Sequence, residues 1–233
     1  MKRDIAASRT FPWALLLAAL MGCAGGPVIR PTPSAEHVPV LFVHGTYDIP
    51  NSFVFMRATF REAGWPEEFL HAVRLQPLNG QLPIEAMAYQ IRRAAEGLRK
   101  RTGAERIDVV AFSQGALSSR YWIQELGGQP HVRRFVSISG PQHGTRAAYL
   151  ARDPAILEMR PDSDFLRALN HRENPFGDTR VFTFWTPFDL VVTPPRSAQL
   201  PGATDRSFLV PLHPMMLGCP AVISATLEAL EQP

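Results

Sequence analysis

The sequence is short of cysteine and lysine, and each shortage excludes a class of protein. Two cysteines among 233 residues, Cys23 and Cys219, do not suffice for a disulfide framework. Lysine occurs only as Lys2 and Lys100 and no stretch is densely basic, so nucleic acid is not an expected partner. No group of ligand-type side chains has zinc spacing, so metal catalysis is not expected. The hydrophobic fraction of 45% is enough for the packed core of one globular domain.

Residues 1–22 have the pattern of a secretory signal peptide, with basic residues at the start followed by an apolar run of about eleven residues. This run is too short for a mature membrane-spanning helix, which needs about 20 residues. Residues 20–23, Leu-Met-Gly-Cys, also resemble the bacterial lipobox, in which the cysteine is lipidated and becomes the new N-terminus. We expect cleavage before Cys23; an ordinary secreted protein and an uncleaved anchor are the alternatives.

Cleavage there lowers the net charge from +3 to +1, so much of the basic character belongs to the targeting segment. Four prolines and few apolar residues between 25 and 39 predict an extended tether over 23–37, followed by one domain over 38–233. Ala24, rather than an acidic residue, follows the cysteine. By analogy with bacterial lipoproteins, the chain is expected to be exported and held by lipid at the outer membrane, facing the periplasm or the cell surface.

Apolar runs alternate with helical patterns along the domain. Strands are predicted at 38–43, 72–75, 107–112, 134–139, 181–185 and 207–210. Helices are predicted at 53–60, at 84–98, after 115 and at 221–230. This alternation indicates an α/β fold with a mostly parallel sheet and helices on both faces. Residues 145–178 break the alternation and are expected to form a helical excursion, which either caps a pocket or adds to the core.

A candidate nucleophile follows the strand at 107–112. Ala-Phe-Ser-Gln-Gly at 111–115 is a variant of the Gly-x-Ser-x-Gly nucleophile elbow, centred on Ser113. The elbow needs small residues two before and two after the serine, because the strand and helix backbones meet there. Gly115 satisfies this requirement, and Ala111 adds one methyl group. Such a string is common by itself, but it becomes informative between a predicted strand and a predicted helix.

A loop after the first strand supplies candidate oxyanion donors. His44-Gly45-Thr46 lies at the carboxyl end of that strand, where ligands bind in parallel sheets. Stabilising an oxyanion needs preorganised donors, which are usually backbone N–H groups on two segments. We predict the N–H groups of Thr46 and Gln114 for this role. His44 is interpreted as a structural residue that braces the loop.

An acid and a base follow the serine in the order acid, then histidine. Asp189 comes just after the strand at 181–185, and His213 follows the next predicted strand. Asp178 and Asp205 are rival acids, but both precede their strands and so belong to the opposite end of the sheet. His143 and His171 are rival bases, and both precede the acid in the sequence. The order serine, acid, histidine is that of α/β-hydrolases.

Several segments together resemble the α/β-hydrolase superfamily, and bacterial lipases and esterases in particular. They are Val-Leu-Phe-Val-His-Gly at 40–45, Val-Val-Ala-Phe-Ser-Gln-Gly at 109–115, Phe-Val-Ser-Ile-Ser-Gly-Pro-Gln-His-Gly-Thr at 135–145 and Leu-Arg-Ala-Leu-Asn at 166–170. The resemblance implies Ser113 as nucleophile, Asp189 as acid and His213 as base. Two positions depart from the family pattern, since Ala111 replaces a glycine and Phe112 stands where many of these lipases have histidine.

These residues predict a serine ester hydrolase that cleaves acyl esters, with lipids as the expected substrates, through an acyl-enzyme and without a cofactor. Two other readings stay open. An acyltransferase or thioesterase would use the same fold with another acceptor or ester, and a catalytically silent envelope lipoprotein would use the pocket only for binding. A fluorophosphonate probe separates the last reading from the others, because it labels only an activated serine.

Replacing Cys23 by serine tests the expected lipid anchor. Cys23→Ser should leave the signal peptide uncleaved at this site and the protein without lipid, since lipid is attached through the thiol. Several acyl chains anchor a protein stably, whereas one chain binds only marginally. Mass spectrometry and membrane fractionation check both outcomes, with Cys219→Ser as the matched control. A Cys23→Ser protein that is still cleaved before residue 23 and still membrane-bound contradicts the expectation.

Overall fold

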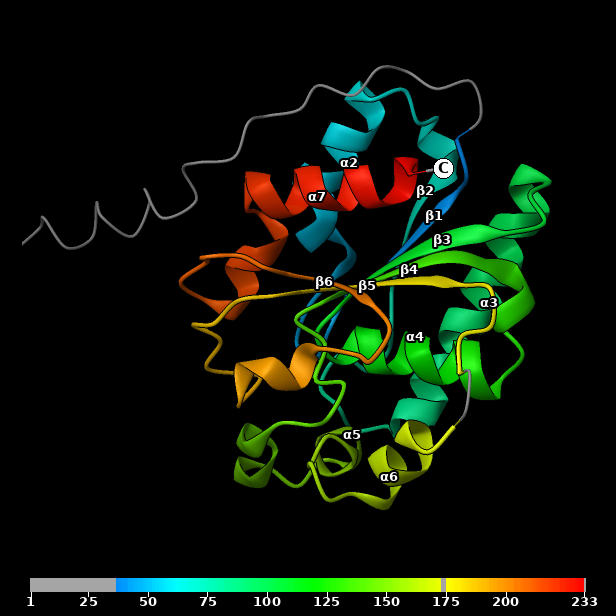
Figure 1. The fold of residues 1–233 in the computed structure, drawn as a ribbon. Coiled ribbons are helices and arrows are strands. Elements are labelled where there is room, and N and C mark those ends of the chain that lie inside the picture. The colour runs from blue at the N-terminus through cyan, green and yellow to red at the C-terminus, as the bar shows by residue number, and fades with distance from the viewer. Residues whose placement is uncertain (1–36, 173–174, 233) are drawn as a thin grey trace, which may run out of the picture.

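The computed structural model describes residues 37–172 and 175–232 (Figure 1). Its six strands form one parallel sheet in the order β2-β1-β3-β4-β5-β6. The strands are β1 Val40–Val43, β2 Leu70–Val73, β3 Ile107–Phe112, β4 Val132–Ile138, β5 Arg180–Trp185 and β6 Thr204–Ser207. This arrangement confirms the predicted α/β fold. The expected signal peptide, Cys23 and nearly all of the tether lie outside the described residues.

Helices cover both faces of the sheet (Figure 1). One face carries α2 (Val54–Glu62) and α7 (Pro220–Glu231), and the other carries α3 (Ile84–Thr102) and α4 (Gln114–Glu125). Successive strand residues alternate between the faces, so Phe42 packs with α2 and α7 while Leu41 packs with α3. Because both of its faces are covered, β1 is continuously apolar, and the neighbouring strand β3 is apolar except for Asp108.

Short 3₁₀ helices occupy many of the connections. They are η1 Pro50–Phe53, η2 Glu67–Phe69, η3 Gln129–His131, η4 Arg146–Leu150, η5 Pro195–Ala198 and η6 His213–Leu217. Within the two described ranges, no helix has the length and apolar character needed to cross a bilayer.

The two edge strands differ from their predicted positions, whereas β3 matches its prediction. The prediction of a strand at 207–210 was wrong, because β6 is formed by Thr204–Ser207 and all four of its residues are exposed. Phe208 and Val210 are buried, but they belong to the loop that follows. Likewise β2 lies at Leu70–Val73 rather than 72–75. Edge strands have one unpaired side, so they do not need a continuous apolar run.

The segment 145–178 packs one side on the domain and exposes the other. Besides η4 it forms α5 (Pro154–Glu158) and α6 (Asp164–Asn170). Its buried residues, with Leu166 and Leu169 among them, form a cluster with Ile84 of α3 and Leu117 of α4. Leu150, by contrast, is 89% exposed. The inner side of this segment is therefore part of the core.

Two leucines of this segment provide a matched test of that division. Leu166→Ala should lower the free energy of unfolding by about 2–5 kcal/mol, because it leaves a cavity in a closed cluster. Leu150→Ala should change it by less than about 0.5 kcal/mol, as for other exposed positions. Chemical denaturation measures both. Equal losses in the two variants would show that the segment does not have a buried and an exposed side.

Candidate active site

Ser113 occupies a strained turn between β3 and α4. Its backbone has φ 54° and ψ −131°, a conformation that residues other than glycine rarely adopt. The N–H of Ser113 donates to the carbonyl oxygen of Ile138 on β4 at 2.9 Å, which holds the turn against the sheet. Strain of this kind persists only where surrounding contacts enforce it, and it is concentrated at functional sites. The local structure is thus the strand–serine–helix elbow that the sequence predicted.

Two glycines make this turn sterically possible. A Cβ atom on Gly115 would lie 2.3 Å from the carbonyl oxygen of His44, and one on Gly45 would lie 2.8 Å from the Cβ of Ser113. Real Cβ atoms do not approach other atoms so closely. The loop after β1 and the start of α4 are therefore in direct backbone contact. This contact brings the loop containing Thr46 next to Ser113.

His44 braces the loop through both ring nitrogens. Its Nε2 accepts the N–H of Leu75 at 3.1 Å, so its proton resides on Nδ1, which donates to the carbonyl oxygen of Gly45 at 2.9 Å. Burial lowers the pKa of His44, which favours this neutral form. His44 is thus a structural residue, as the sequence suggested.

Asp189 and His213 form a buried pair. Oδ2 of Asp189 lies 2.7 Å from Nδ1 of His213, and both side chains are almost inaccessible to solvent. The other carboxylate oxygen, Oδ1, accepts the N–H groups of Val191 at 2.9 Å and Val192 at 2.8 Å. These bonds fix the carboxylate, which in turn orients the imidazole with its proton on Nδ1.

The second ring nitrogen of His213 is available for proton transfer. Its Nε2 atom is buried and makes no hydrogen bond to any part of the chain that the structure describes. The ring of Phe112 lies 4.7 Å from the imidazole, centroid to centroid, and supports its orientation. Ser113 and His213 line the same cavity. A neutral imidazole with this free nitrogen can accept a proton from a hydroxyl group brought within reach.

A side-chain hydrogen bond joins the two segments predicted to bind an oxyanion. The hydroxyl of Thr46 donates to Oε1 of Gln114 at 3.2 Å, and the amide of Gln114 donates to the hydroxyl of Ser118 at 3.0 Å. Gln114 is the first residue of α4, and the first N–H groups of a helix have no partner within it. No local sequence pattern indicates this bond, because Thr46 and Gln114 are far apart in the chain.

The cavity beside Ser113 has a volume of about 490 Å³ and a mainly apolar wall. Regions far apart in the sequence contribute to it: the loop after β1, the elbow at Phe112 and Ser113, the segment around 141–159 and the two loops that hold Asp189 and His213. Its lining comprises Thr46, Tyr47, Asp48, Ser52, Phe112, Ser113, Pro141, Thr145, Ala147, Ala148, Ala151, Ile156, Met159, Val191, Val192, His213, Pro214 and Leu217. The size and apolar wall suit an extended hydrocarbon group.

The rival acids and bases lie elsewhere. Asp205 belongs to β6 and accepts hydrogen bonds from Thr183 and Trp185, so it is not positioned before its strand as predicted. Asp178 lines a different cavity, at the opposite end of the sheet. His143 and His171 are exposed and line none of the cavity beside Ser113. Within the described ranges, no group of three or more His, Cys, Asp or Glu residues could hold a metal ion.

Comparisons with known proteins agree with this geometry. The family model for "Lipase (class 2)" matches residues 37–203. The triacylglycerol lipase of Pseudomonas fragi is 27% identical over 115 residues, which cover 47% of this chain and 36% of that lipase. The matched part is thus about a third of that curated relative.

Solved structures share the fold at low sequence identity. The mature form of the Bacillus licheniformis lipase BlEst2 superposes with a TM-score of 0.71 at 15% identity, covering 88% of this chain and 99% of that one. Aspergillus fumigatus lipase B gives a TM-score of 0.71 at 19% identity, covering 86% of this chain and 54% of that one. At these identities the likeness concerns the fold.

Replacing Gly115 tests the close contact that supports the turn. Gly115→Ala should lower the free energy of unfolding by about 1–3 kcal/mol, because the backbone must move to accommodate the new atom. Gly97→Ala is the matched control, since it lies within α3 and its Cβ would meet only the flexible end of Arg101. That control should gain up to about 1 kcal/mol from helix propensity. Equal stability changes in the two variants would refute a special role for Gly115.

Proposed function

The chain belongs to the class 2 lipase family, and from that premise we propose that it is a serine ester hydrolase acting on acyl esters of lipids. The observation that carries the proposal is the strained elbow of Ser113 on the wall of an apolar cavity that also contains His213. The pairing of His213 with Asp189 supports the same reading. An ordinary serine in a turn would need none of these features.

In the proposed first step, Ser113 attacks the carbonyl carbon of the ester. Nε2 of His213 accepts the hydroxyl proton, and Asp189 stabilises the resulting imidazolium without taking the proton itself. The negative charge that develops on the carbonyl oxygen is stabilised by the N–H groups of Thr46 and Gln114. His213 then protonates the leaving alcohol, and the acyl group remains on Ser113.

The second step is hydrolysis of this acyl-enzyme. Water enters, His213 removes its proton, and the resulting attack passes through the same oxyanion site. The fatty acid leaves as His213 returns the proton to Ser113. All the groups required are side chains and backbone amides of this chain.

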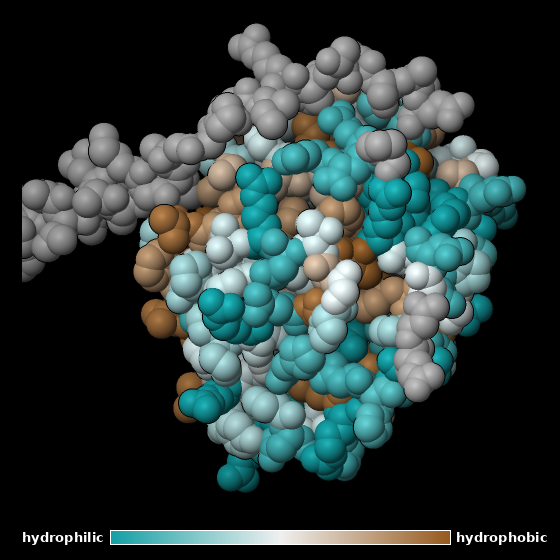
Figure 2. Space-filling model, in the orientation of Figure 1, coloured by the Kyte–Doolittle hydropathy of each residue, from teal (hydrophilic) through white to brown (hydrophobic). Residues whose placement is uncertain are grey.

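The surface around the cavity favours a lipid substrate. Tyr47 of the lining is exposed, and so are three apolar residues that adjoin the lining in the chain: Leu150, Leu190 and Leu212. Figure 2 shows apolar side chains at the left edge of the molecule, over the loops that follow the carboxyl ends of the strands. Such gatherings of exposed apolar surface mark binding sites. We therefore propose that the substrate is presented from a lipid aggregate or membrane.

The proposed location follows from the N-terminal sequence. With Cys23 lipidated, the tether would hold the domain beside the outer membrane, where acyl esters are abundant in the lipid itself. The lipobox-like residues and Ala24 support this location. The Cys23→Ser experiment above tests it independently of activity.

Ser113→Ala tests the proposed nucleophile. It should reduce kcat on p-nitrophenyl esters by on the order of 10⁴-fold or more and abolish fluorophosphonate labelling, because the attacking oxygen is gone. Ser119→Ala is the matched control, since Ser119 lies on α4, directly after the turn of Ser113, is buried and does not line the cavity. A folded Ser113→Ala protein with near-normal activity refutes the mechanism.

Ile156→Trp tests whether the cavity accepts the acyl chain. The larger side chain narrows the cavity, so kcat/KM for long-chain esters should fall relative to that for short-chain esters. The expected fall is on the order of tenfold, which corresponds to about two methylene groups losing their contacts. Leu157→Trp is the control, because Leu157 does not line the cavity. An unchanged chain-length profile in Ile156→Trp would place the acyl chain elsewhere.

A further inference from the structure

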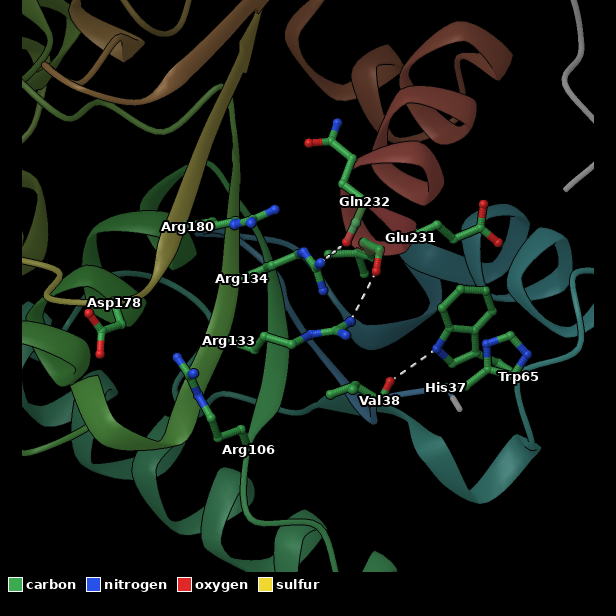
Figure 3. A pocket seen from close by; sticks show the side chains of 11 residues that line it. His37, Val38, Trp65, Arg106, Arg133, Arg134, Asp178, Arg180, Glu231 and Gln232 are labelled. Atoms are coloured by element: carbon green, nitrogen blue, oxygen red, sulfur yellow. Dashed lines mark hydrogen bonds between the residues drawn. The ribbon is translucent and has the colours of Figure 1, made fainter. Parts of the chain in front are cut away.

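A second cavity lies at the opposite end of the sheet, where the strands begin, and has a volume of about 430 Å³ (Figure 3). Four arginines line it from three neighbouring strands. Arg106 directly precedes β3, Arg133 and Arg134 belong to β4, and Arg180 is the first residue of β5. The C-terminal end of α7 closes one side. None of these residues belongs to the cavity that contains Ser113.

An irregularity in β4 brings two of the arginines to the same side. Ile107 of β3 pairs with Val132 of β4, but the next residue, Asp108, pairs with Arg134. Arg133 is therefore an extra residue in β4. Neighbouring residues of a regular strand face opposite sides, whereas a bulge redirects a side chain. Arg133 and Arg134 both reach the end of α7, where they donate to the carbonyl oxygens of Leu230 and Gln232. Figure 3 shows both side chains directed toward that helix end.

One of these two guanidinium groups has a carboxylate partner. Arg133 forms a two-fold salt bridge with the buried Asp108, with distances of 3.0 Å from Nε to Oδ1 and 2.5 Å from Nη2 to Oδ2. Asp108 therefore neutralises Arg133. This pair accounts for Arg133 and leaves Arg134 and Arg106 to be explained.

Arg134 is buried with unmet hydrogen-bonding capacity. It is only 4% exposed, and its Nε and Nη1 atoms have no hydrogen-bond partner among residues 37–172 and 175–232. Nε of Arg106 is also buried and has no hydrogen-bond partner among these residues. Neither arginine forms a salt bridge with a described residue. Burying a cation without a counter-charge is costly, and leaving its N–H groups unbonded adds to the cost.

The neighbouring charges increase this cost. Burial lowers the pKa of Arg134 and the adjacent Arg133 lowers it further. Asp108 partly offsets these effects, whereas Arg180 and Arg106 add smaller downward contributions. Asp178 and Glu231 also line the cavity, but neither forms a salt bridge with Arg106 or Arg134. An anion in the cavity would remove the repulsion and satisfy the open N–H groups together.

We propose that this cavity binds a phosphate group, carried either by a soluble phosphate compound or by the head group of a phospholipid. Guanidinium groups present paired donors that match phosphate oxygens, and several of them together suit the negative charge that a phosphate monoester and a phosphodiester both carry. The site is separate from the catalytic cavity. Its existence does not depend on the proposed hydrolase activity.

Calorimetric titration of the full chain with inorganic phosphate, at constant ionic strength set with sodium chloride, tests the site. The wild type should bind one phosphate per chain. Arg134→Gln should bind at least tenfold more weakly, because it loses a charge-assisted contact. Arg93→Gln, with the same change of charge at an exposed position on α3, should bind as the wild type does. Absence of phosphate binding by the wild type, or equal weakening in both variants, overturns the proposal.

A second variant and a second ligand complete the test. Arg106→Gln should also weaken binding at least tenfold, and it serves where Arg134→Gln fails to fold, since Arg106 is less buried. Glycerophosphoglycerol, a soluble phosphodiester head group, is titrated in parallel. Binding as tight as that of phosphate indicates a phospholipid ligand, and binding of phosphate alone indicates a soluble one. Full phosphate affinity in Arg106→Gln contradicts the proposed site.

Discussion

The direct backbone contact between the loop after β1 and the start of α4 is the constraint on which the site depends. Neither Gly45 nor Gly115 has room for a side chain where the two segments meet. The contact holds Ser113 in its strained conformation and brings the loop containing Thr46 beside the start of α4. His44 keeps the loop in place by a hydrogen bond from the neighbouring chain segment at Leu75. The chemistry therefore rests on a packing requirement of the backbone.

A second set of contacts ties the cavity wall to the acid loop. The hydroxyl of Thr145 donates to the carbonyl oxygen of Val191 at 2.6 Å and accepts the N–H of Thr193 at 2.9 Å. Behind this wall the buried Arg120, whose pKa burial lowers to about 10, donates to Asn170 and to the carbonyl oxygen of Leu169. The bonds of Thr145 join the cavity wall to the segment whose N–H groups fix Asp189. The bonds of Arg120 join α4 to the end of α6. A change in the wall is thereby coupled to the position of the carboxylate.

Sequence patterns predicted the amphipathic helices and the central strands, and they misplaced the two edge strands of the sheet. The strand at 107–112 is central, buried throughout and apolar except for Asp108, so its bounds could be predicted from the sequence pattern. At the edge, the buried Phe208 and Val210 have the alternating spacing of a strand, whereas the observed strand β6 is polar. The elbow around Ser113 was visible because it is local in sequence. The bonds from Thr46 to Gln114 and from Thr145 to Val191 join distant residues, so no local pattern reveals them.

The polar character of β6 has a consequence for how the molecule meets other copies of itself. An open strand edge has unpaired N–H and C=O groups that can pair with a strand of another molecule and so extend the sheet between molecules. The edge at Thr204–Ser207 carries an acid and a base side by side, and Asp205 is tied inward to Thr183, Trp185 and Gln199. A second strand pairing here would have to bury the charge of Arg206 or disrupt those bonds. The polar character of β6 thus protects this edge of the sheet against aggregation.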